Sequence, residues 1–382
     1  MKLAIVRQKY TPYGGAERFV ERALAGLRSQ GVEVTVIARE WAGSGDAPRA
    51  AGIPDGILKV DPFYLGRTWR DVGFSHHVQR IVAEGRFDLV QSHERIPGCH
   101  IYRAGDGVHA TWLELRNKAR GGLAHFLAGR SPWHRYVLET EAAMFRHPSL
   151  SAVICNSRMV KDDIARRFGV APEKLHVIPN GVDLDAFHPG LREEHRERVH
   201  AELGIPPDAP VILFVGSGFE RKGVHVLLRA FAAMENKAAH LVVVGKDRHL
   251  NVASMLAQTL DIDERVHFLG GREDVRPYYG AADLFCLPTL YDPMPNAALE
   301  AMACGLPVIT STTCGAAELI EAGKNGFVCD ALDVAALSGR MDAVLAGVGH
   351  AAVAVRAAVA ALSLETMTRR LLDLYGNLQT KV

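Results

Sequence analysis

The 382-residue sequence has few of the features that mark exported, metal-binding or nucleic-acid-binding proteins. Its six cysteines include no CxxC pair and no zinc-ribbon spacing, so we expect reduced thiols in the core. The charges nearly cancel, at a formal net charge of +1, which argues against a nucleic-acid binder. No run of about 20 uncharged apolar residues is present, and the apolar start of the chain is too short for a signal peptide. We therefore expect a cytosolic protein.

Short runs rich in β-branched residues alternate with longer amphipathic stretches along the chain. This alternation is typical of parallel βαβ units. The expected strands form two series, separated by Pro179 and an Asn180-Gly181 turn. The first series is Leu3–Val6, Val32–Ala38, Leu89–Ser92, Ala152–Cys155 and Leu175–Ile178, and the second is Val211–Val215, Leu241–Val244, Val266–Leu269, Leu284–Leu287 and Pro307–Thr310.

The two series predict two doubly wound α/β domains, since a chain of this length exceeds what one hydrophobic core usually supports. We place the first domain over residues 1–178 and the second over 179–362. The last segment, 363–382, carries a helical pattern that we expect to cross back onto the first domain. In open α/β sheets the ligand lies outside the carboxyl ends of the strands, so the residues that follow strands are the candidates for function, in a cleft between two such domains.

Glycine-rich turns follow the first expected strand of each domain. Gly14 and Gly15 open into an amphipathic helix, where glycines either let a ligand approach backbone N–H groups or make a tight turn. In segment 216–223, Arg221 and Lys222 are adjacent cations at a helix start, where a diphosphate fits; a solvated surface pair is the alternative. The glycine spacing and the lack of an acidic residue about 20 positions later disfavour a nicotinamide dinucleotide.

Two carboxylates flank the start of an expected helix after the strand that ends at Leu287. Asp292 lies in the loop, and Glu300 lies about two turns away on the helix. The first N–H groups of that helix, at Asn296 and Ala297, can face an anion. A ribose-diphosphate-sugar ligand suits this geometry. The alternative is that Asp292 caps the helix and Glu300 is a solvated helix residue.

Taken together, these segments resemble glycosyltransferase family 4, and within it the lipopolysaccharide core glucosyltransferase I group, over essentially the whole chain. The resemblance implies a GT-B fold and retaining transfer of a sugar from a nucleotide-diphosphate-sugar, with UDP-sugar expected, to a glycolipid or polysaccharide hydroxyl such as that of lipopolysaccharide core. The donor is then a co-substrate, and neither a cofactor nor an obligatory metal is implied. The matching segments are Gly14–Arg18, Ile154–Ser157, Pro179–Asp183, Gly216–Gly223 and Tyr291–Gly305.

The resemblance also implies roles for individual residues in binding the donor. Arg221 and Lys222 would hold the diphosphate, and Glu300 the ribose. Asp292 would contact the transferred sugar, where the family usually has a glutamate whose reach is one methylene longer. Contacts to the base would come from the loop that carries Arg272. The remaining donor-binding positions implied are Gly14, Gly15, Asn296 and Ala297.

The family places a histidine or aspartate of the first domain beside the anomeric carbon. Asp106 matches this position best, with His109 and His93 as rivals. Asp106 lies between two glycines and could equally be a turn residue, and most histidines in a chain with 17 are structural. The implied catalytic set is Asp106, Asp292 and Lys222.

Segment 103–135 differs in composition from the rest of the chain. It carries six basic residues against two acidic ones, interleaved with leucines and with Trp112 and Trp133. These residue types settle at a lipid headgroup boundary. We expect this segment to hold the protein at an anionic membrane, on the inner face of the cytoplasmic membrane. A basic connecting helix with an ordinary core face is the alternative.

Two other functions are compatible with the same two-domain frame. A nucleotide-sugar epimerase also binds such a donor, and a catalytically silent subunit would keep the fold while binding a partner glycosyltransferase. The presence of Arg221, Lys222 and Glu300 argues against the silent subunit.

Overall fold

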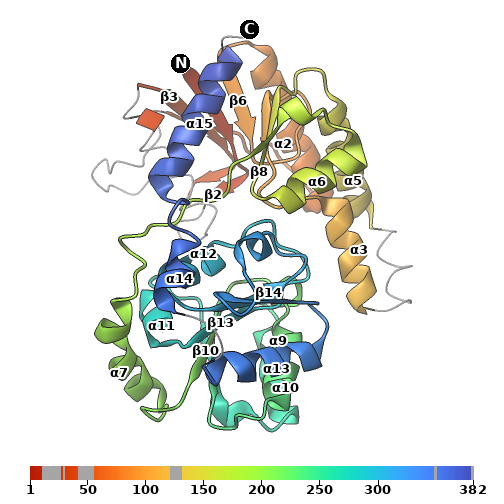
Figure 1. Ribbon diagram of the computed structural model, residues 1–382. Helices are drawn as coiled ribbons and strands as arrows, with labels where there is room; N and C mark the ends of the chain where they lie inside the picture. The colour runs from red at the N-terminus through yellow and green to blue at the C-terminus, as the bar shows by residue number, and fades with distance from the viewer. Residues whose placement is uncertain (11–26, 29–30, 42–55, 121–130, 348–350, 380–382) are drawn as a thin grey trace. The chain divides into compact units, whose positions relative to one another are not determined.

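The structure, a computed structural model, describes residues 1–10, 27–28, 31–41, 56–120, 131–347 and 351–379. The chain divides into two compact units, each of which has helices packed around a parallel sheet (Figure 1). The first unit comprises Met1–Gly181 and Leu364–Val382, and the second comprises Val182–Ser363. The chain therefore enters the second unit just after the Asn-Gly turn and returns to the first at its last helix.

The sheet of the first unit has seven parallel strands in the order β5-β3-β1-β6-β7-β8-β9. The β-branched runs predicted five of them, and those predictions are confirmed. Strands β5 and β7 were not predicted, because each is short and ends in a charged residue. The bounds are β1 Lys2–Val6, β3 Glu33–Ala38, β5 Gly56–Lys59, β6 Leu89–Ser92, β7 Ile101–Arg103, β8 Ala152–Cys155 and β9 Leu175–Val177, with a separate pair of strands, β2 Lys9–Tyr10 and β4 Glu40–Trp41.

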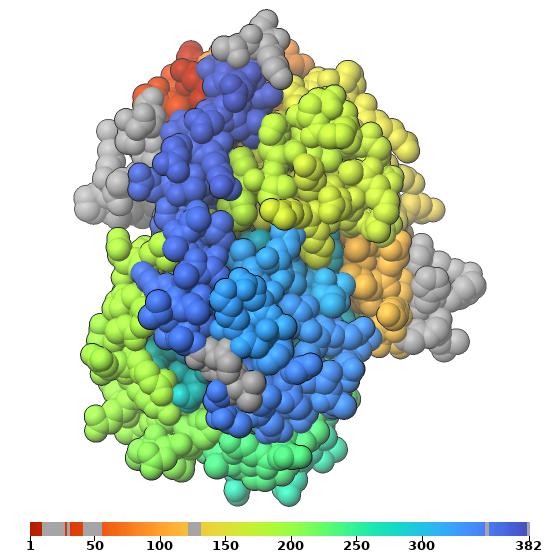
Figure 2. Space-filling model, in the orientation of Figure 1, coloured from red at the N-terminus to blue at the C-terminus, as the bar shows by residue number. Residues whose placement is uncertain are grey.

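Helix α15 (Leu364–Gln379) closes the first unit. Met367, Leu371 and Tyr375 recur at intervals of four residues on one face, and they are buried in the same core cluster as the strand residues Leu3 and Val34. Figure 2 shows the outer face of this helix at the surface in deep blue. Within the described residues, the other helices of this unit are α2 Gly66–Ala83, α3 His109–Arg120, α5 Pro132–Arg146 and α6 Arg158–Phe168, with a 3-10 turn at Pro172–Lys174.

The sheet of the second unit has six parallel strands in the order β12-β11-β10-β13-β14-β15. Their side chains and those of the helices packed against them form one large core cluster. Five of the strands match the predicted runs. The bounds are β10 Val211–Val215, β11 His240–Val244, β12 Val266–Gly270, β13 Leu284–Leu287, β14 Val308–Ser311 and β15 Gly326–Cys329.

The helices of the second unit cover both faces of this sheet (Figure 1). They are α7 Leu191–Leu203, α8 Phe219–Lys222, α9 Val224–Ala233, α10 Leu250–Thr259, α11 Arg276–Ala281, α12 Asn296–Ala303, α13 Val334–Leu345 and α14 Ala352–Ala357, with 3-10 turns at Asp263–Arg265 and Gly315–Leu319. All six cysteines of the chain lie in buried positions as free thiols. Within the described ranges, no helix has both the length and the apolar character needed to span a bilayer.

Candidate functional site

The polar loops of the second unit gather at the carboxyl ends of its central strands. Loops follow β11, β10 and β13, which are neighbours in the sheet, so the loops meet at one edge. This is the edge at which α/β sheets bind ligands. The loop after β10 carries Arg221 and Lys222, and the loop after β13 carries Asp292 and leads into α12.

Lys222 and Asp292 form a buried ion pair in which the lysine Nζ donates to the carboxylate Oδ2. Only 9% of Lys222 and 5% of Asp292 is exposed. Burial alone raises the pKa of Asp292, but the charges of Lys222 and Arg221 and hydrogen bonds from Lys222 and the Met294 N–H outweigh it. The pKa therefore lies below its usual value, and the carboxylate is ionised at neutral pH.

The Asp292 loop is tied to two neighbouring segments through backbone groups. The Arg221 carbonyl accepts a hydrogen bond from the Leu290 N–H at 2.8 Å. The Asp292 N–H donates to the Thr313 carbonyl at 3.1 Å, and its carbonyl accepts from the Gly315 N–H at 2.8 Å. Because backbone bonds fix both sides of the loop, the position of the Asp292 side chain does not depend on its own rotamer alone.

Close approach of the two loops requires a glycine at Gly223. Its φ is +79°, and a Cβ there would lie 2.0 Å from the Pro288 carbonyl oxygen. Gly223 also separates α8 from α9, so Arg221 and Lys222 lie in the last turn of α8. The expectation that these cations begin a helix is therefore wrong, because the chain makes a short extra helix before the long one.

The N–H groups at the start of α8 bind the carboxylate of Asp247, a residue not predicted from the sequence. Its carboxylate accepts hydrogen bonds from the N–H groups of Phe219 at 2.8 Å and His249 at 2.7 Å. Burial raises the pKa of Asp247, but backbone bonds from His249, Phe219 and Gly218 outweigh it and lower the pKa. The N–H groups of the glycine-rich turn thus have an anionic partner within the chain. The signal for Asp247 was its place just after a strand.

Glu300 is held by a second residue that was missed, Tyr279 on α11. The Tyr279 hydroxyl donates to Glu300 Oε2 at 2.9 Å and lies 3.1 Å from the Ala297 carbonyl oxygen. Its ring is 1% exposed and packs edge-on against Phe187. No spacing rule predicts this pair, because the tyrosine reaches α12 from a six-residue helix 21 positions earlier.

The start of α12 has the form expected from the sequence. The helix begins at Asn296, and its N-cap is Pro295, which makes no side-chain capping bond. Asp292 is therefore not the cap, and the capping alternative is excluded. Asn296 and Ala297 are half-buried in the first turn. Arg272 lies exposed in the loop between β12 and α11, beside an Asp274–Arg276 ion pair.

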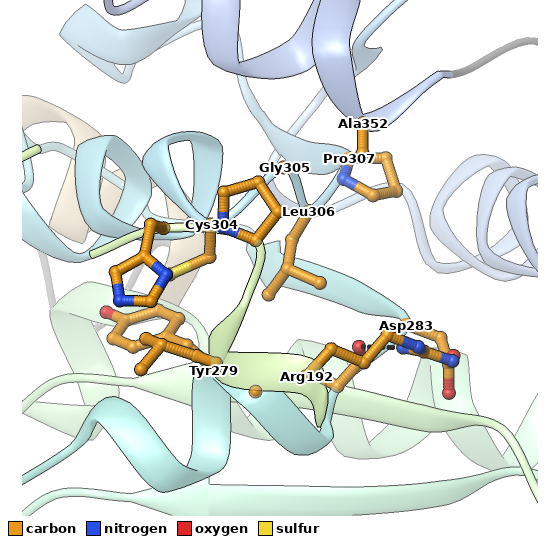
Figure 3. Close-up of a pocket in the computed structure, with 13 residues that line it drawn as sticks. Arg192, Tyr279, Asp283, Cys304, Gly305, Leu306, Pro307 and Ala352 are labelled. Carbon is orange, nitrogen blue, oxygen red and sulfur yellow. Dashed lines mark hydrogen bonds and ion pairs between the residues drawn. The ribbon is translucent and has the colours of Figure 1, made fainter. Parts of the chain in front are cut away.

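A cavity of about 260 Å³ lies in the second unit at the opposite edge of the sheet (Figure 3). Tyr279 and Cys304 lie on one side of it, and Arg192 and Asp283, joined at 2.9 Å, lie on the other. Asp283 comes directly before β13, so the cavity is at the amino ends of the strands. It reaches the Tyr279 ring but not the edge that carries Lys222 and Asp292.

The candidates of the first unit differ in exposure. Asp106 is exposed in the turn after β7, where the Gly107 N–H donates to the Ala104 carbonyl at 3.1 Å. His93 is buried, and its Nε2 lies 3.1 Å from Gln91 Nε2. Burial, with the nearby charges of Arg7 and Arg103, lowers the pKa of His93 well below its usual value. Gly14 and Gly15 lie outside the described residues.

His109 is the first residue of α3 and is buried. Its N–H donates to the Glu141 carboxylate at 2.9 Å, and its Nε2 lies 3.0 Å from His134 Nδ1. Burial lowers its pKa to about 3, helped by Arg95 and then by His134 and two further arginines. His109 is thus a neutral ring within a side-chain network.

Some of the basic side chains of segment 103–135 are buried or half-buried. Arg103 is buried and donates to Asn180 Oδ1 at 2.9 Å, and Arg116 contacts His134. Trp133 is half-buried. Residues 121–130 lie outside the described part of the chain. Among the described basic residues of the segment, the exposed ones are Lys118, Arg120 and Arg135.

Two family models match the chain in succession. The model described as Glycosyltransferase Family 4 matches residues 13–186, and the model described as Glycosyl transferases group 1 matches residues 195–358. The lipopolysaccharide glucosyltransferase WaaG of Escherichia coli K12 is 28% identical over 331 residues, covering 86% of this chain and 85% of that protein. A D-inositol 3-phosphate glycosyltransferase of Xylanimonas cellulosilytica is 27% identical, covering 95% of this chain and 91% of that protein. The crystal structure of WaaG superposes with a TM-score of 0.81 at 25% identity, covering 97% of this chain and 99% of that one.

Proposed function

Because the chain belongs to the family 4 glycosyltransferases, which are retaining enzymes with nucleotide-sugar donors, we propose that it transfers a hexose from a UDP-sugar to a hydroxyl of a glycolipid or polysaccharide acceptor such as lipopolysaccharide core. The GT-B fold expected from the sequence is confirmed. The choice of acceptor is supported by the similarity to a lipopolysaccharide glucosyltransferase. The observation that carries the proposal for the donor is the buried Lys222–Asp292 pair at the carboxyl edge of the second sheet.

The donor lies, in this proposal, along the loops after β10 and β13. Negative charge grows on the leaving diphosphate as the sugar becomes oxocarbenium-like. Arg221 and Lys222 stabilise that charge, and the N–H groups of Asn296 and Ala297 add the positive end of α12. Because Lys222 is already fixed by an ionised partner, little reorganisation is needed during the reaction.

In this proposal, the carboxylates of Asp292 and Glu300 bind different parts of the donor. Asp292 accepts hydrogen bonds from hydroxyls of the transferred sugar, and Glu300, oriented by the Tyr279 hydroxyl, accepts them from the ribose. Arg272 lies in the exposed loop assigned to the base. This division predicts that the two carboxylates respond differently to free nucleotide and to nucleotide-sugar.

The first unit supplies the acceptor side and one residue beside the anomeric carbon. Asp106 is the best candidate for that residue, since it is exposed at the carboxyl edge of β7 while His93 and His109 are buried in networks. Gly14 and Gly15 belong to the donor site in this proposal. The leaving phosphate accepts the proton of the attacking hydroxyl on the same face, so no protein nucleophile is required.

The enzyme works, in this proposal, in the cytoplasm at the inner face of the cytoplasmic membrane. The free thiols suit a reducing compartment. Exposed Lys118, Arg120 and Arg135 of segment 103–135 supply the contact with anionic lipid. Each basic residue contributes on the order of 1 kcal/mol near such a surface. The test is vesicle sedimentation: the triple change to glutamate should release the protein from anionic vesicles, and unchanged binding would contradict the contact.

Sugar transfer itself is tested with UDP-, GDP- and ADP-hexoses and truncated lipopolysaccharide cores as acceptors. The expected product gains one hexose by mass, and proton NMR of its anomeric signal shows the configuration of the donor. Lys222→Ala serves as the inactive control, and Lys324→Ala, an exposed lysine paired with Glu321, as the matched active one. Conversion of the donor to an epimer or to free sugar phosphate, with no product in any acceptor, would overturn the proposal.

A further inference from the structure

A compact group of arginine and histidine side chains in the first unit has no role in the donor site. Arg67 stacks on Trp133, with its Cζ 3.3 Å from the ring centroid. Arg116 Nη1 lies 3.3 Å from His134 Nε2, and His134 Nδ1 lies 3.0 Å from His109 Nε2. We call these five residues the arginine–histidine cluster.

The cluster is built on the beginnings of three helices. Arg67 is in the first turn of α2, His109 opens α3, and Trp133 and His134 are in the first turn of α5. None of these first turns holds an acidic residue. The N-terminal ends of helices carry partial positive charge, so all three add to the field of the arginines. Helices α2 and α3 also follow the carboxyl ends of β5 and β7, where α/β sheets bind ligands.

Two acidic residues, Asp71 and Glu141, help to hold the cluster together. Asp71 accepts from Trp133 Nε1 at 2.8 Å and from Arg70 at 2.8 Å. Glu141 pairs with Arg95 at 2.7 Å and accepts from the N–H of His109. Each carboxylate thus has an arginine of its own in addition to the group that it orients.

The electrostatic environment of the two rings is positive. Burial lowers the pKa of His134, and the charges of Arg116 and Arg67 lower it further. For His109 the same two arginines act together with burial, Arg95 and His134. Both rings are therefore neutral at neutral pH beside cationic side chains, and this arrangement attracts an arriving anion.

We propose that the arginine–histidine cluster is a binding site for a phosphate-class anion carried by the acceptor, an inference that rests on the proposed glycosyltransferase function. A guanidinium stacked on an indole keeps its N–H donors in its own plane, where they match a phosphate in a two-point contact. Arg67 is held in this way by Trp133, and Arg116 is oriented by His134. The anion is clamped between the two guanidinium groups, beside the histidine rings.

The histidine rings report occupancy without any enzyme assay. Inorganic phosphate is the probe, and ring-proton NMR signals of His109 and His134 are followed in the full-length protein. Phosphate should shift both ring signals in a saturable manner and raise the pKa of both rings, because the anion reverses the field of Arg67, Arg95 and Arg116.

The test variants and their control each replace one arginine by glutamine, and the control lies on the same helix as Arg67. Arg67→Gln and Arg116→Gln should each weaken phosphate binding by about tenfold. Arg80→Gln, which removes an exposed arginine from the same helix as Arg67, should leave it within twofold. Unshifted ring signals at saturating phosphate, or equal losses in all three variants, would overturn the site.

A lipid headgroup carries the same anion, so anionic and neutral vesicles form the second arm. If Arg67→Gln and Arg116→Gln abolish vesicle binding while free phosphate never shifts the rings, the cluster is a membrane contact and the proposal is wrong. The readout is separate from sugar transfer. Phosphate binding without transferase activity would contradict the proposed function but support the anion site. Sugar transfer to a neutral acceptor without phosphate binding would support the proposed function and contradict the anion site.

Discussion

In the second unit, the loop after β13 holds Asp292 buried against Lys222, whereas in the first unit the turn after β7 leaves Asp106 exposed. Both residues follow strands of a parallel sheet. Backbone hydrogen bonds fix the loop that carries Asp292. In the first unit, the polar residues around the start of α3, which follows the Asp106 turn, are linked mainly through their side chains. A fixed electrostatic site suits charge that develops at one place during a reaction. A side-chain network can adjust to acceptors of different shape.

The largest effect should follow from breaking the buried pair. Lys222→Ala should lower turnover by about 100-fold, as the loss of a charge-assisted contact to the diphosphate. It should also destabilise the second unit by about 3–5 kcal/mol, because the Asp292 charge is left buried without its partner. Sugar transfer and thermal unfolding measure the two effects.

The double variant Lys222→Met with Asp292→Leu separates stability from function. Replacing a buried ion pair by apolar residues of similar volume is often neutral for stability. The double variant should therefore regain the lost stability and stay inactive. If the double variant remains as unstable as Lys222→Ala, the main role of the Lys222–Asp292 pair is to stabilise the fold.

On the exposed side of the comparison, Asp106→Asn should act on turnover alone. The side chain is exposed, so the free energy of unfolding should stay within about 0.5 kcal/mol of wild type. Donor binding should change by less than twofold, while kcat falls by about 30-fold or more, as expected on loss of a group acting in the transition state. An unchanged kcat would place the reacting sugar away from this turn.

A smaller effect is expected for the residue that orients Glu300. Tyr279→Phe removes one hydrogen bond to a carboxylate, so binding of nucleoside diphosphate should weaken by about fivefold to tenfold. The neighbouring Tyr278→Phe on the same helix is the matched control and should bind as wild type does. Titration calorimetry measures both. Equal binding by the two variants would show that Glu300 does not need the phenol.

A further prediction concerns the pH dependence of stability, to which buried histidines of both units contribute. Burial is the first cause that lowers the pKa of His109 to about 3 and of His240 to about 4, helped by Arg95 in the first case and His267 in the second. The unfolded value is about 6.5, so unfolding takes up protons below that pH. Stability should be complete above about pH 6.5 and fall as the pH drops towards these folded-state values.

Replacing either histidine should reduce the loss of stability that occurs as the pH falls. His240→Asn should make the unfolding of the second unit less sensitive between pH 7 and pH 5, and His109→Asn should do the same for the first unit. The two slopes are read from chemical denaturation followed at each pH. Slopes that stay as steep as those of wild type would assign the acid sensitivity to other groups.

Strand runs were predictable where β-branched residues filled them, as in Val211–Val215, and were missed where they were short and mixed, as in Gly56–Lys59. The loops that carry Lys222 and Asp292 were also predictable as candidates, because both follow strands. Their pairing was not, since the partners are 70 residues apart and each has a plausible ligand of its own. Asp247 and Tyr279 act through hydrogen bonds that only the tertiary packing creates.

The donor site is tested most directly by comparing the binding of free UDP with that of a UDP-hexose in two variants of the second unit. Calorimetric titration of Glu300→Gln should show both ligands weakened by about tenfold or more, because the ribose contact is common to both. Asp292→Asn should leave free UDP bound at least as tightly as in wild type, because Lys222 keeps its charge, and should weaken only the UDP-hexose. Equal losses of both ligands in both variants, or no binding of UDP to the wild type, would contradict the donor site described for this edge of the sheet.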